Sequence, residues 1–479
     1  MNKQASFDKD SIFNGSHLDD DIKRIDILLQ DEISKNNDKI IVLDDDPTGV
    51  QTVHNVSVFT DWSEESIRNG FKEKNKMFFI LTNSRGFSEK ETIKAHSEIG
   101  KIIEEVAMKE NKSYQIISRS DSTLRGHYPI ETEILKEKIE NYNDNKIDGE
   151  ILCPYFKEGG RFTINDTHYV KEGEQLTPAG ETEFAKDKTF GYTSSNLCDY
   201  VEEKTNGKYK KEQIISISIE ELRNIKLDEI ETKLLNTKDY NKIVVNAADD
   251  IDIKVFCIAL YRAIAKGKKF LYRTAAGFVK VFGGITDKHL LSKQEMIIEN
   301  ENNGGIVIVG SHTLKTSEQL EALREIEDIE FIEFNSDLVL EEGKLEDEVS
   351  RVVSKEEIYL SEGKTVVVYT KRKLLTLEND TKEEALKRSV KISDAVQSLI
   401  GKLNVTPAFI IAKGGITSSD IGTKALKVKR ANILGQIKPG IPVWQTGKES
   451  RFPNVPYVIF PGNVGEVTTL KDSVEILLG

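Results

Sequence analysis

The strongest constraint on the fold is a regular alternation of short apolar runs with longer helical patterns. Strand-like runs occur at residues 40–43, 77–81, 115–118 and 150–153. Helical patterns follow two of these runs, at 89–108 and 130–140. Such alternation predicts parallel strands joined by crossover helices. A later run at 242–245 precedes Asp249 and Asp250, which we interpret as caps of a helix that extends to about residue 265.

The length of the chain predicts more than one hydrophobic core. A chain of 479 residues exceeds what a single core usually covers, so we expect two α/β domains. The polar stretch 286–304 is the best boundary, and a hinge there would let two halves close around substrates. We therefore predict a polar N-terminal extension at 1–38, a first domain with a mainly parallel sheet at 39–290, and a second at 300–479.

Three consecutive carboxylates follow the first strand-like run, in the sequence Asp44-Asp45-Asp46-Pro47-Thr48-Gly49. Like charges this close raise one another's proton affinity, so such a cluster is maintained mainly when a cation, a substrate hydroxyl or a proton-transfer role stabilises it. The end of a strand is also where open α/β sheets bind ligands. The alternative interpretation is a solvated acidic turn in which Pro and Gly end the strand.

Two further strand ends carry complementary polar groups. Arg119, Asp121, Ser122 and Arg125 follow the run at 115–118, and Arg85 follows the run at 77–81. The planar donor fork of arginine suits carboxylate and phosphate oxygens. Together the strand ends suggest one crevice for a small, anionic, hydroxylated molecule.

The C-terminal third has a different chemistry, in which strand-like runs lead into glycine and hydroxyl residues. Lys413-Gly414-Gly415-Ile416-Thr417 follows the run at 408–412 and precedes a helix expected from near Ile421. Gly310-Ser311 and Gly462-Asn463-Val464-Gly465 follow two other runs. Exposed loop N–H groups and helix N-termini can hold phosphate oxygens. Each loop alone is also a common packing feature, but three in one domain favour a phosphate site.

At this point the motifs carry a family resemblance. The runs 44–49, 121–126, 413–418 and 462–465 resemble the signature segments of the four-carbon acid sugar kinase family, in the expected order. The resemblance implies an N-terminal sugar-acid domain and a C-terminal nucleotide domain. It also implies phosphorylation of the terminal hydroxyl of threonate, erythronate or 3-oxo-tetronate by ATP. Val50, His127 and Pro461 depart from the usual family residues and leave the particular acid open.

Read onto this chain, the motifs and the resemblance give three groups of candidate residues. The catalytic candidates are Asp45, Asp46 and Asp121. The substrate-binding candidates are Thr48, Arg85, Arg119, Ser122, Arg125 and Arg161. The cofactor-binding candidates are Ser311, Lys413, Gly414, Gly415, Ile416, Thr417, Gly462, Asn463 and Gly465. The resemblance also makes residues 154–196, including His168, an extended wall of the sugar site, whereas the residues alone indicate a loop histidine.

Phosphoryl transfer requires an aligned acceptor, neutralised phosphate charge and excluded water. Our hypothesis is that one of the three aspartates orients the acceptor hydroxyl and accepts its proton. Arginines would clamp the acid carboxylate or the transferring phosphoryl group. Mg²⁺ would be bound mainly by the ATP phosphates, and no metal site made of protein ligands alone is predicted.

Two alternatives stay open. Asp44, Asp46 and Thr48 also fit the nucleophile loop of haloacid-dehalogenase-like phosphatases, in which Asp44 would be phosphorylated. That reading explains nothing in the C-terminal third, and Pro47 stands where many such enzymes have Gly. A non-catalytic sensor would keep the crevice without needing the aspartates. A Walker-type P-loop is absent from the sequence, which excludes a P-loop kinase.

Composition favours a soluble, cytoplasmic enzyme with small-molecule partners. The formal charge of −13 argues against a nucleic-acid or anionic-membrane partner. Three widely spaced cysteines indicate neither a disulfide framework nor a zinc site. We expect no signal peptide, and no apolar run approaches the roughly 20 residues that span a bilayer. The oligomeric state is left open, with a homodimer as one alternative.

Overall fold

The computed structural model divides the chain into two compact units. The N-terminal unit contains the residues up to Asp45 together with Trp62–Asp287, and the C-terminal unit contains Asp46–Asp61 and Lys288–Gly479. The structure describes residues 19–142, 146–173, 175–296, 298–299, 302–373, 375–377, 380–462 and 464–479. Asn463 and residues 1–18 therefore lie outside the described part, as do some residues of the predicted boundary at 286–304.

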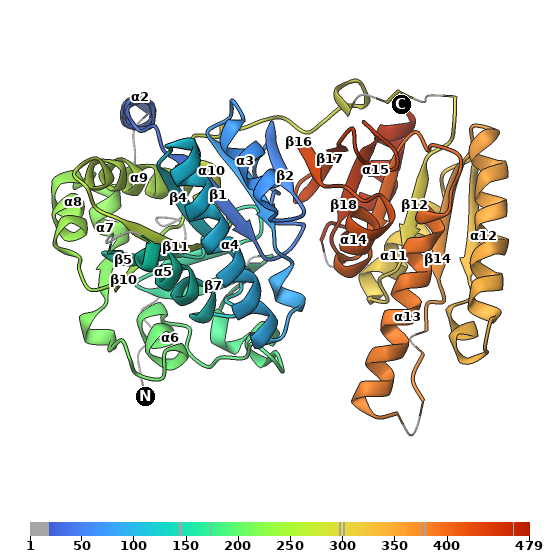
Figure 1. Ribbon diagram of the computed structural model, residues 1–479, viewed down its shortest axis with the longest axis horizontal. Helices are drawn as coiled ribbons and strands as arrows, with labels where there is room; N and C mark the ends of the chain where they lie inside the picture. Colours follow the sequence, from blue (N-terminus) through green and yellow to red (C-terminus); the bar gives the residue numbers. More distant parts are fainter. Residues whose placement is uncertain are drawn as a thin grey trace. The chain divides into compact units, whose positions relative to one another are not determined.

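The N-terminal unit is built on a parallel sheet, as the strand and helix alternation predicted (Figure 1). Each neighbouring pair in this sheet is parallel. The strand order is β3 (Met77–Leu81), β1 (Lys39–Asp44), β4 (Tyr114–Arg119), β11 (Phe270–Thr274), β5 (Gly149–Cys153), β10 (Asn241–Val245) and β9 (Ile215–Ile217).

Helices cover this sheet because its strands are apolar on both faces. β1, β3 and β5 are buried along their whole length, which requires cover on both sides. One group of helices packs together as α3 (Glu64–Lys72), α4 (Glu89–Glu110) and α5 (Ile130–Tyr142). A second group packs around α9 (Asp250–Ala265), with α2 (Asp19–Lys35), α7 (Ile219–Arg223), α8 (Leu227–Asn236) and α10 (Ala276–Phe282).

Local signals explain where several helices begin. Ser88 and Glu91 form a capping box at the start of α4. Asp249 is the N-cap of α9 and accepts a hydrogen bond from the backbone N–H of Ile251, which confirms its predicted capping role. The predicted N-terminal extension contains α2, and Lys254 of α9 forms an ion pair with Asp26 of α2 at 2.6 Å.

Residues 154–196, which lack clear periodicity, form a small antiparallel sheet. Its strands are β6 (Arg161–Ile164), β7 (Thr167–Glu172) and β8 (Gln175–Pro178). His168 lies within β7 and pairs with Thr163 across the ladder. The interpretation of His168 as a loop histidine was therefore wrong. The helix α6 (Leu197–Lys204) follows this sheet.

The C-terminal unit has a parallel sheet with an antiparallel extension. Parallel pairs join β13 (Ile329–Phe334), β14 (Thr365–Thr370), β12 (Ile306–Val309), β15 (Ile410–Lys413) and β18 (Pro456–Phe460), in this order. Antiparallel pairs then add β17 (Ile441–Thr446), β16 (Arg430–Lys438) and β2 (Val56–Phe59). The helices are α11 (Leu314–Leu323), α12 (Lys344–Ser361), α13 (Lys382–Gly401), α14 (Gly415–Asp420) and α15 (Thr469–Leu478).

Two features of this unit differ from the sequence-based expectation. The predicted first domain contained residues 46–61, but this segment belongs to the C-terminal unit because β2 pairs with β16, with Val56 opposite Ile433. The helix expected from near Ile421 begins earlier, at Gly415, because Gly414 at φ 124° makes the turn from β15 within one residue.

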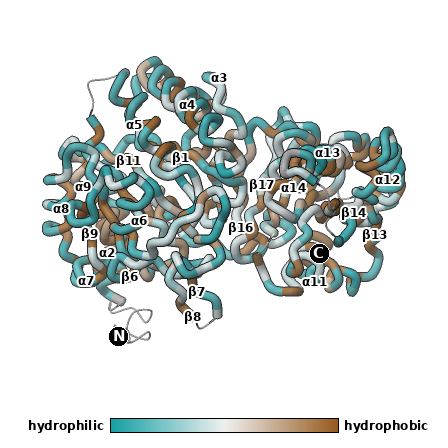
Figure 2. Tube along the Cα trace, turned by 90° about the horizontal axis from the view of Figure 1, so that it is seen from below, coloured by the Kyte–Doolittle hydropathy of each residue, from teal (hydrophilic) through white to brown (hydrophobic). Residues whose placement is uncertain are grey.

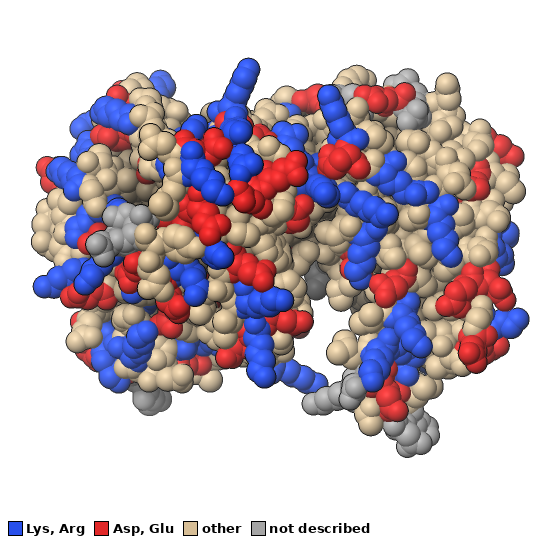
Figure 3. Space-filling model, in the orientation of Figure 1, with Lys and Arg blue, Asp and Glu red and all other residues tan. Residues whose placement is uncertain are grey.

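The surfaces of both units are polar and carry charges of both signs. Helices such as α4 and α12 combine hydrophilic and hydrophobic residues along their length (Figure 2), as expected where one side faces a sheet. Figure 3 shows Lys and Arg interspersed with Asp and Glu on the visible face of each unit. Among the described residues, every helix is too short or too polar to cross a membrane.

Candidate functional site

The structure brings the polar strand ends of the N-terminal unit to one edge of its sheet. β1 lies between β3 and β4, and Asp44 is in register with Leu81 on one side and Arg119 on the other. Because all three strands are parallel, the residues that follow them emerge at the same carboxyl edge. This is the edge at which open α/β sheets bind ligands.

Asp45 is the buried centre of this edge. Its side chain belongs to a residue only 3% exposed. Arg85 donates to it in a two-pronged arrangement, from Nη2 to Oδ1 at 2.7 Å and from Nε to Oδ2 at 3.2 Å. Nη1 of Arg119 lies 3.3 Å from Asp45 Oδ1 and 3.0 Å from Asp44 Oδ1. Burial raises the pKa of Asp45, although both guanidiniums oppose the shift. Its carboxylate is therefore a better proton acceptor than an ordinary aspartate.

The pKa of Asp121 is shifted in the opposite direction to that of Asp45. Arg125 Nε donates to Asp121 Oδ2 at 2.6 Å, and the Thr123 hydroxyl donates to the same oxygen. Burial alone would raise the pKa of Asp121, but the guanidiniums of Arg85 and Arg125 and these hydrogen bonds hold it well below the usual range. Asp121 is therefore a firmly ionised partner that positions Arg125.

Arg161, the first residue of β6, has unused hydrogen-bonding capacity. Both Arg161 and Arg125 lie over the ring of Phe184, at 5.6 and 5.1 Å from its centroid. Among the described residues, Arg161 Nε has no hydrogen-bond partner, and no carboxylate lies within ion-pair distance of this side chain. Burial lowers the pKa of Arg161 although Asp121 opposes the shift. An anionic ligand would supply the missing counter-charge.

Beneath this edge lies a buried ion pair that sequence reasoning missed. Arg273 of β11 donates from Nη1 to Glu131 Oε2 at 2.6 Å and from Nη2 to the carbonyl oxygen of Arg125 at 3.1 Å. Glu131 also accepts a hydrogen bond from Ser84 Oγ at 2.8 Å. Burial would raise the pKa of Glu131, but Arg273 and His96 lower it to about 2. One ion pair thus ties together the loops that follow β3 and β4.

The same loops contain other tight restraints. Gly126 adopts φ 122°, and a Cβ placed there would lie 2.7 Å from Nη2 of Arg273, so only glycine fits. His168 bridges the carbonyl oxygen of Ser122 at 2.7 Å and the Thr163 hydroxyl at 3.0 Å. Burial lowers the pKa of His168 to about 4, so the imidazole is neutral and braces the loop.

Asp46 and Thr48 form a separate local turn. The backbone N–H and the hydroxyl of Thr48 donate to Asp46 Oδ1 at 2.8 and 2.6 Å. This pattern is typical of an Asx-turn. The three aspartates are thus divided, because Asp44 and Asp45 belong to the N-terminal unit and Asp46 to the C-terminal unit.

In the C-terminal unit the glycine loops after β12, β15 and β18 meet. We call Gly310, Ser311, Gly414, Thr417 and Gly462 the glycine cradle. A Cβ on Gly310 would lie 2.2 Å from the Thr417 hydroxyl, and one on Gly414 or Gly462 would lie 3.3 Å from Ser311 atoms. These contacts require glycine at Gly310 and leave little space at the other two positions.

Hydroxyl groups line one side of the cradle, and the other side is open. Thr316 Oγ1 donates to Ser311 Oγ at 3.1 Å or to the Gly462 carbonyl oxygen at 3.2 Å. A Cβ on Gly415 would meet nothing within 4 Å, and Ile416 is 74% exposed. Gly465, at φ 84°, packs against Thr469 instead. The predicted residue Asn463 lies outside the described part of the chain.

Lys413 supports the cradle from below. Its Nζ donates to the carbonyl oxygens of Pro461 at 2.7 Å and Gly462 at 3.2 Å. Burial, with the nearby charge of Lys315, lowers the pKa of Lys413 to about 7. A neutral amine has two N–H donors, which matches the two carbonyl acceptors. The side chain therefore holds the third loop against the end of β15.

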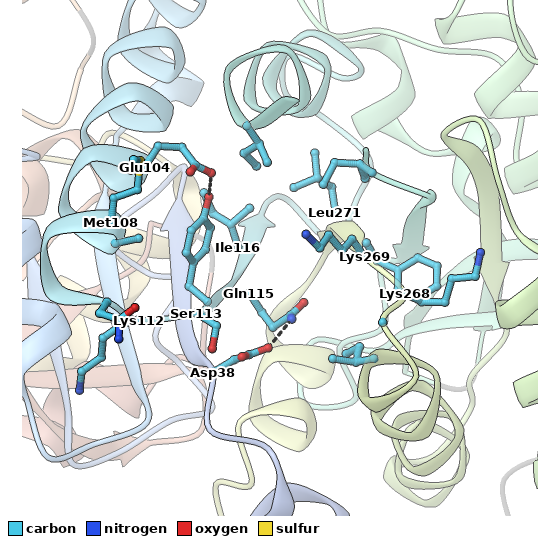
Figure 4. Close-up of a pocket in the computed structure, with 18 residues that line it drawn as sticks. Asp38, Glu104, Met108, Lys112, Ser113, Gln115, Ile116, Lys268, Lys269 and Leu271 are labelled. Atoms are coloured by element: carbon cyan, nitrogen blue, oxygen red, sulfur yellow. Dashed lines mark hydrogen bonds between the residues drawn. The ribbon is translucent and has the colours of Figure 1, made fainter. Parts of the chain in front are cut away.

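A cavity of about 600 Å³ lies at the other edge of the N-terminal sheet, where the strands begin (Figure 4). Asp38, Gln115, Ile116, Lys269 and Leu271 are among its lining residues. Gln115 Nε2 donates to Asp38 Oδ2 at 2.6 Å, and Tyr114 donates to Glu104. Because its acidic groups already have partners and the edge is the amino end of the strands, we do not place the candidate site here.

Comparisons with known proteins agree with this two-part description. A family model for a sugar-binding N-terminal domain matches residues 40–282, and one for a nucleotide-binding C-terminal domain matches residues 306–470. The chain is similar to Haemophilus influenzae protein HI1011, with 19% identity, a TM-score of 0.60, and coverage of 91% of this chain and 100% of that one. A Salmonella typhimurium LT2 structure gives 16% identity, a TM-score of 0.63, and coverage of 91% and 98%. No curated protein matches the chain.

At these identities the solved structures show the fold, whereas the domain models cover most of the chain and show the family. The chain belongs to the four-carbon acid sugar kinase family. One of its domains is therefore of the sugar-binding kind and the other of the nucleotide-binding kind.

The buried pair Arg273–Glu131 should contribute strongly to stability. Replacing Arg273 by Met leaves Glu131 as an uncompensated buried charge, which should lower the free energy of unfolding by about 3–5 kcal/mol. Lys254→Met removes a partly exposed ion pair and should cost about 1 kcal/mol or less. Denaturant unfolding measures both, and equal losses in the two variants would contradict the assigned role.

Lys413 should make stability depend on pH in the alkaline range. Between its folded pKa of about 7 and its ordinary value of 10.5, the folded protein has released a proton that the unfolded chain retains. The free energy of unfolding should therefore rise with pH in this window, by at most about 1.4 kcal/mol per pH unit from this group. Lys413→Met should remove that slope, whereas Lys448→Met, at an exposed position, should retain it. Indistinguishable slopes for wild type and Lys413→Met would refute the assignment.

Proposed function

We propose that this protein is an ATP-dependent kinase that phosphorylates the terminal hydroxyl of a four-carbon sugar acid such as threonate, erythronate or 3-oxo-tetronate. The observation that carries the proposal is that the sugar-binding domain contains both Asp45 and Arg161, each with a property that suits this substrate. One is a buried carboxylate with a raised pKa, and the other is a guanidinium without a counter-charge among the described residues. These are the groups that a hydroxylated carboxylic acid requires.

The residues of the N-terminal unit would divide the work as follows. Arg161 binds the substrate carboxylate, because Arg85 and Arg125 already donate to Asp45 and Asp121. Asp45 orients the acceptor hydroxyl and accepts its proton, because its raised pKa suits a general base better than the depressed pKa of Asp121. Asp121 keeps Arg125 in place beside the substrate.

The glycine cradle fits the phosphates of a nucleotide. The Gly414 N–H already donates to the carbonyl oxygen of Phe460 at 2.9 Å, so the backbone N–H groups offered to a ligand are those from Gly415 onward, where the open side lies. Ser311 and Thr417 add hydroxyl groups. Ile416 and Leu314 are 74% and 76% exposed and offer an apolar surface to a nucleotide base. ATP, when bound, supplies the phosphoryl group. Mg²⁺ would be held mainly by its phosphates, and no cluster of metal-ligating side chains occurs in the described ranges.

The phosphatase alternative does not fit the position of Asp44. This residue ends β1, is only 1% exposed, and is bound by Arg119. As a nucleophile Asp44 would have to give up its ion pair with Arg119, and the family models that match the chain are sugar-binding and nucleotide-binding models, which give the phosphatase no support. The cytoplasmic location and the homodimer stay predictions.

Replacing Asp45 by Asn should separate catalysis from binding. We expect kcat to fall by about 10²- to 10⁴-fold with nearly unchanged binding of the acid, because the amide keeps the shape but cannot accept the proton. Asp121→Asn should instead raise KM for the acid, because Arg125 loses its partner. Steady-state kinetics with matched titrations of acid binding distinguish the two, and normal turnover in Asp45→Asn would exclude it as the base.

The pH profile provides an independent test of the same assignment. The active form of a general base is ionised, so a raised pKa moves the acid limb of kcat/KM upward, above the ordinary aspartate value of about 3.9. An acid limb at or below that value would contradict the role of Asp45.

The reaction class is tested by ATP consumption with a panel of four-carbon sugar acids. We expect ADP formation to depend on the acid and to be absent with the corresponding neutral sugars, because Arg161 needs a carboxylate. Arg161→Met should abolish this discrimination. Phosphate release from a generic phosphomonoester, without acid-dependent ADP formation, would instead favour a phosphatase.

A further inference from the structure

Arg372 lies at the carboxyl edge of the C-terminal sheet but belongs to no glycine loop. It follows β14 by two residues, and β14 is the parallel neighbour of β12, which leads to Gly310 and Ser311. Its sequence context is Lys371-Arg372-Lys373, a basic run that indicates only a solvated turn. The sheet order therefore brings to the cradle a charge that the sequence pattern does not reveal.

Contacts within the unit fix one edge of the Arg372 guanidinium. Nη2 donates to the carbonyl oxygen of Ser311 at 2.5 Å, and Nε and Nη2 lie 3.2 and 3.1 Å from the Ser317 hydroxyl. Ser317 stands in the first turn of α11, so the guanidinium joins the end of β14 to the start of that helix. The side chain is therefore held in one orientation beside Ser311.

The other edge of the guanidinium has no partner in the part of the chain that the structure describes. Among the described residues, Arg372 Nη1 and the neighbouring His312 Nδ1 are both buried atoms without a hydrogen-bond partner. Buried polar atoms of this kind usually have a partner, which can be a ligand.

The charge of Arg372 also indicates a ligand at this position. In the part of the chain that the structure describes, no carboxylate pairs with Arg372, although the adjacent Lys371 pairs with Asp337 at 2.7 Å. Burial lowers the pKa of Arg372, and none of the acidic residues that the structure describes offsets the shift. A half-buried guanidinium without a counterion favours an anionic ligand, and planar donors suit phosphate oxygens.

We propose that Arg372 binds the polyphosphate chain of the nucleotide through its free Nη1 edge and so completes the glycine cradle. The inference rests on the proposed kinase function and adds its main phosphate-binding charge. Lys413 does not supply this phosphate-binding charge, because its Nζ donates to the carbonyl oxygens of Pro461 and Gly462. Because the proposed contact is to phosphate oxygens, Arg372 would distinguish ligands by their phosphates and not by base or ribose.

The test is calorimetric binding of ATP, adenosine and inorganic tripolyphosphate to the full chain. Arg372→Met should weaken ATP and tripolyphosphate by about 10- to 100-fold and leave adenosine unchanged, because a charge-assisted hydrogen bond is lost. Lys373→Met removes a neighbouring exposed charge and should change ATP affinity by less than about threefold. Arg372→Lys keeps the charge without the planar fork and should recover only part of the loss.

Two results would overturn the assignment. One is that Arg372→Met binds ATP as tightly as Lys373→Met does. The other is that Arg372→Met loses ATP and adenosine binding equally. If thermal unfolding shows that Arg372→Met is not folded, the test uses Arg372→Lys instead, and a wild-type ATP affinity in Arg372→Lys contradicts the proposal.

Other outcomes separate this inference from the proposed kinase function. Tripolyphosphate binding that depends on Arg372, without turnover of any four-carbon acid, supports the inference and rejects the kinase. Turnover by Arg372→Met with an unchanged KM for ATP supports the kinase and rejects the role of Arg372. A wild-type protein that binds neither ATP nor tripolyphosphate rejects both proposals.

Discussion

The N-terminal unit depends on the burial of compensated charge at one edge of its sheet. Asp45 is enclosed by the guanidiniums of Arg85 and Arg119, and beneath them Glu131 is bound by Arg273. Removing Arg273 leaves the charge of Glu131 uncompensated, and removing Arg85 or Arg119 leaves Asp45 with one of its two guanidiniums, so the loops have little freedom to rearrange. The result is a rigid set of donors and acceptors, which a small polar substrate needs for alignment.

The candidate site of the C-terminal unit is built from backbone and hydroxyl groups and not from paired charges. Its cradle consists of backbone and hydroxyls, since Gly310, Gly414 and Gly462 allow three loops to approach one another closely. In our proposal Arg372 neutralises the ligand charge, because among the described residues its Nη1 has no partner and its Nη2 donates to the Ser311 carbonyl oxygen beside the cradle. In the proposed function, charged groups would bind and activate the acceptor in one unit, and close-packed backbone would bind phosphate in the other.

Local patterns predicted the parts of the fold that arise from local causes. The strands before Asp45, Arg85 and Asp121 were found because their apolar runs end in polar residues, and Asp249 was found as a cap. The early start of α14 was missed because Gly, Thr and Ser are poor helix formers, and the geometry of Gly414 overrides their preference.

Long-range partners could not be found from local patterns. Arg273 and Arg372 stand in a strand and a basic turn without any motif, and only the sheet order brings them to Glu131 and Ser311. The pairing of β2 with β16 joins residues more than 370 positions apart, with Arg430 Nη2 donating to Ser57 Oγ at 2.8 Å. A charged or polar residue within an apolar strand is the available signal, because such a group requires a buried partner.

The most direct measurement of the central claim is a crystal structure of the protein with a four-carbon sugar acid bound. The account predicts the acid at the carboxyl edge of the N-terminal sheet, with its carboxylate hydrogen-bonded to Arg161 and its terminal hydroxyl within hydrogen-bond distance of Asp45. An acid bound at the amino edge, in the cavity beside Lys269, or one whose carboxylate avoids Arg161, would contradict it.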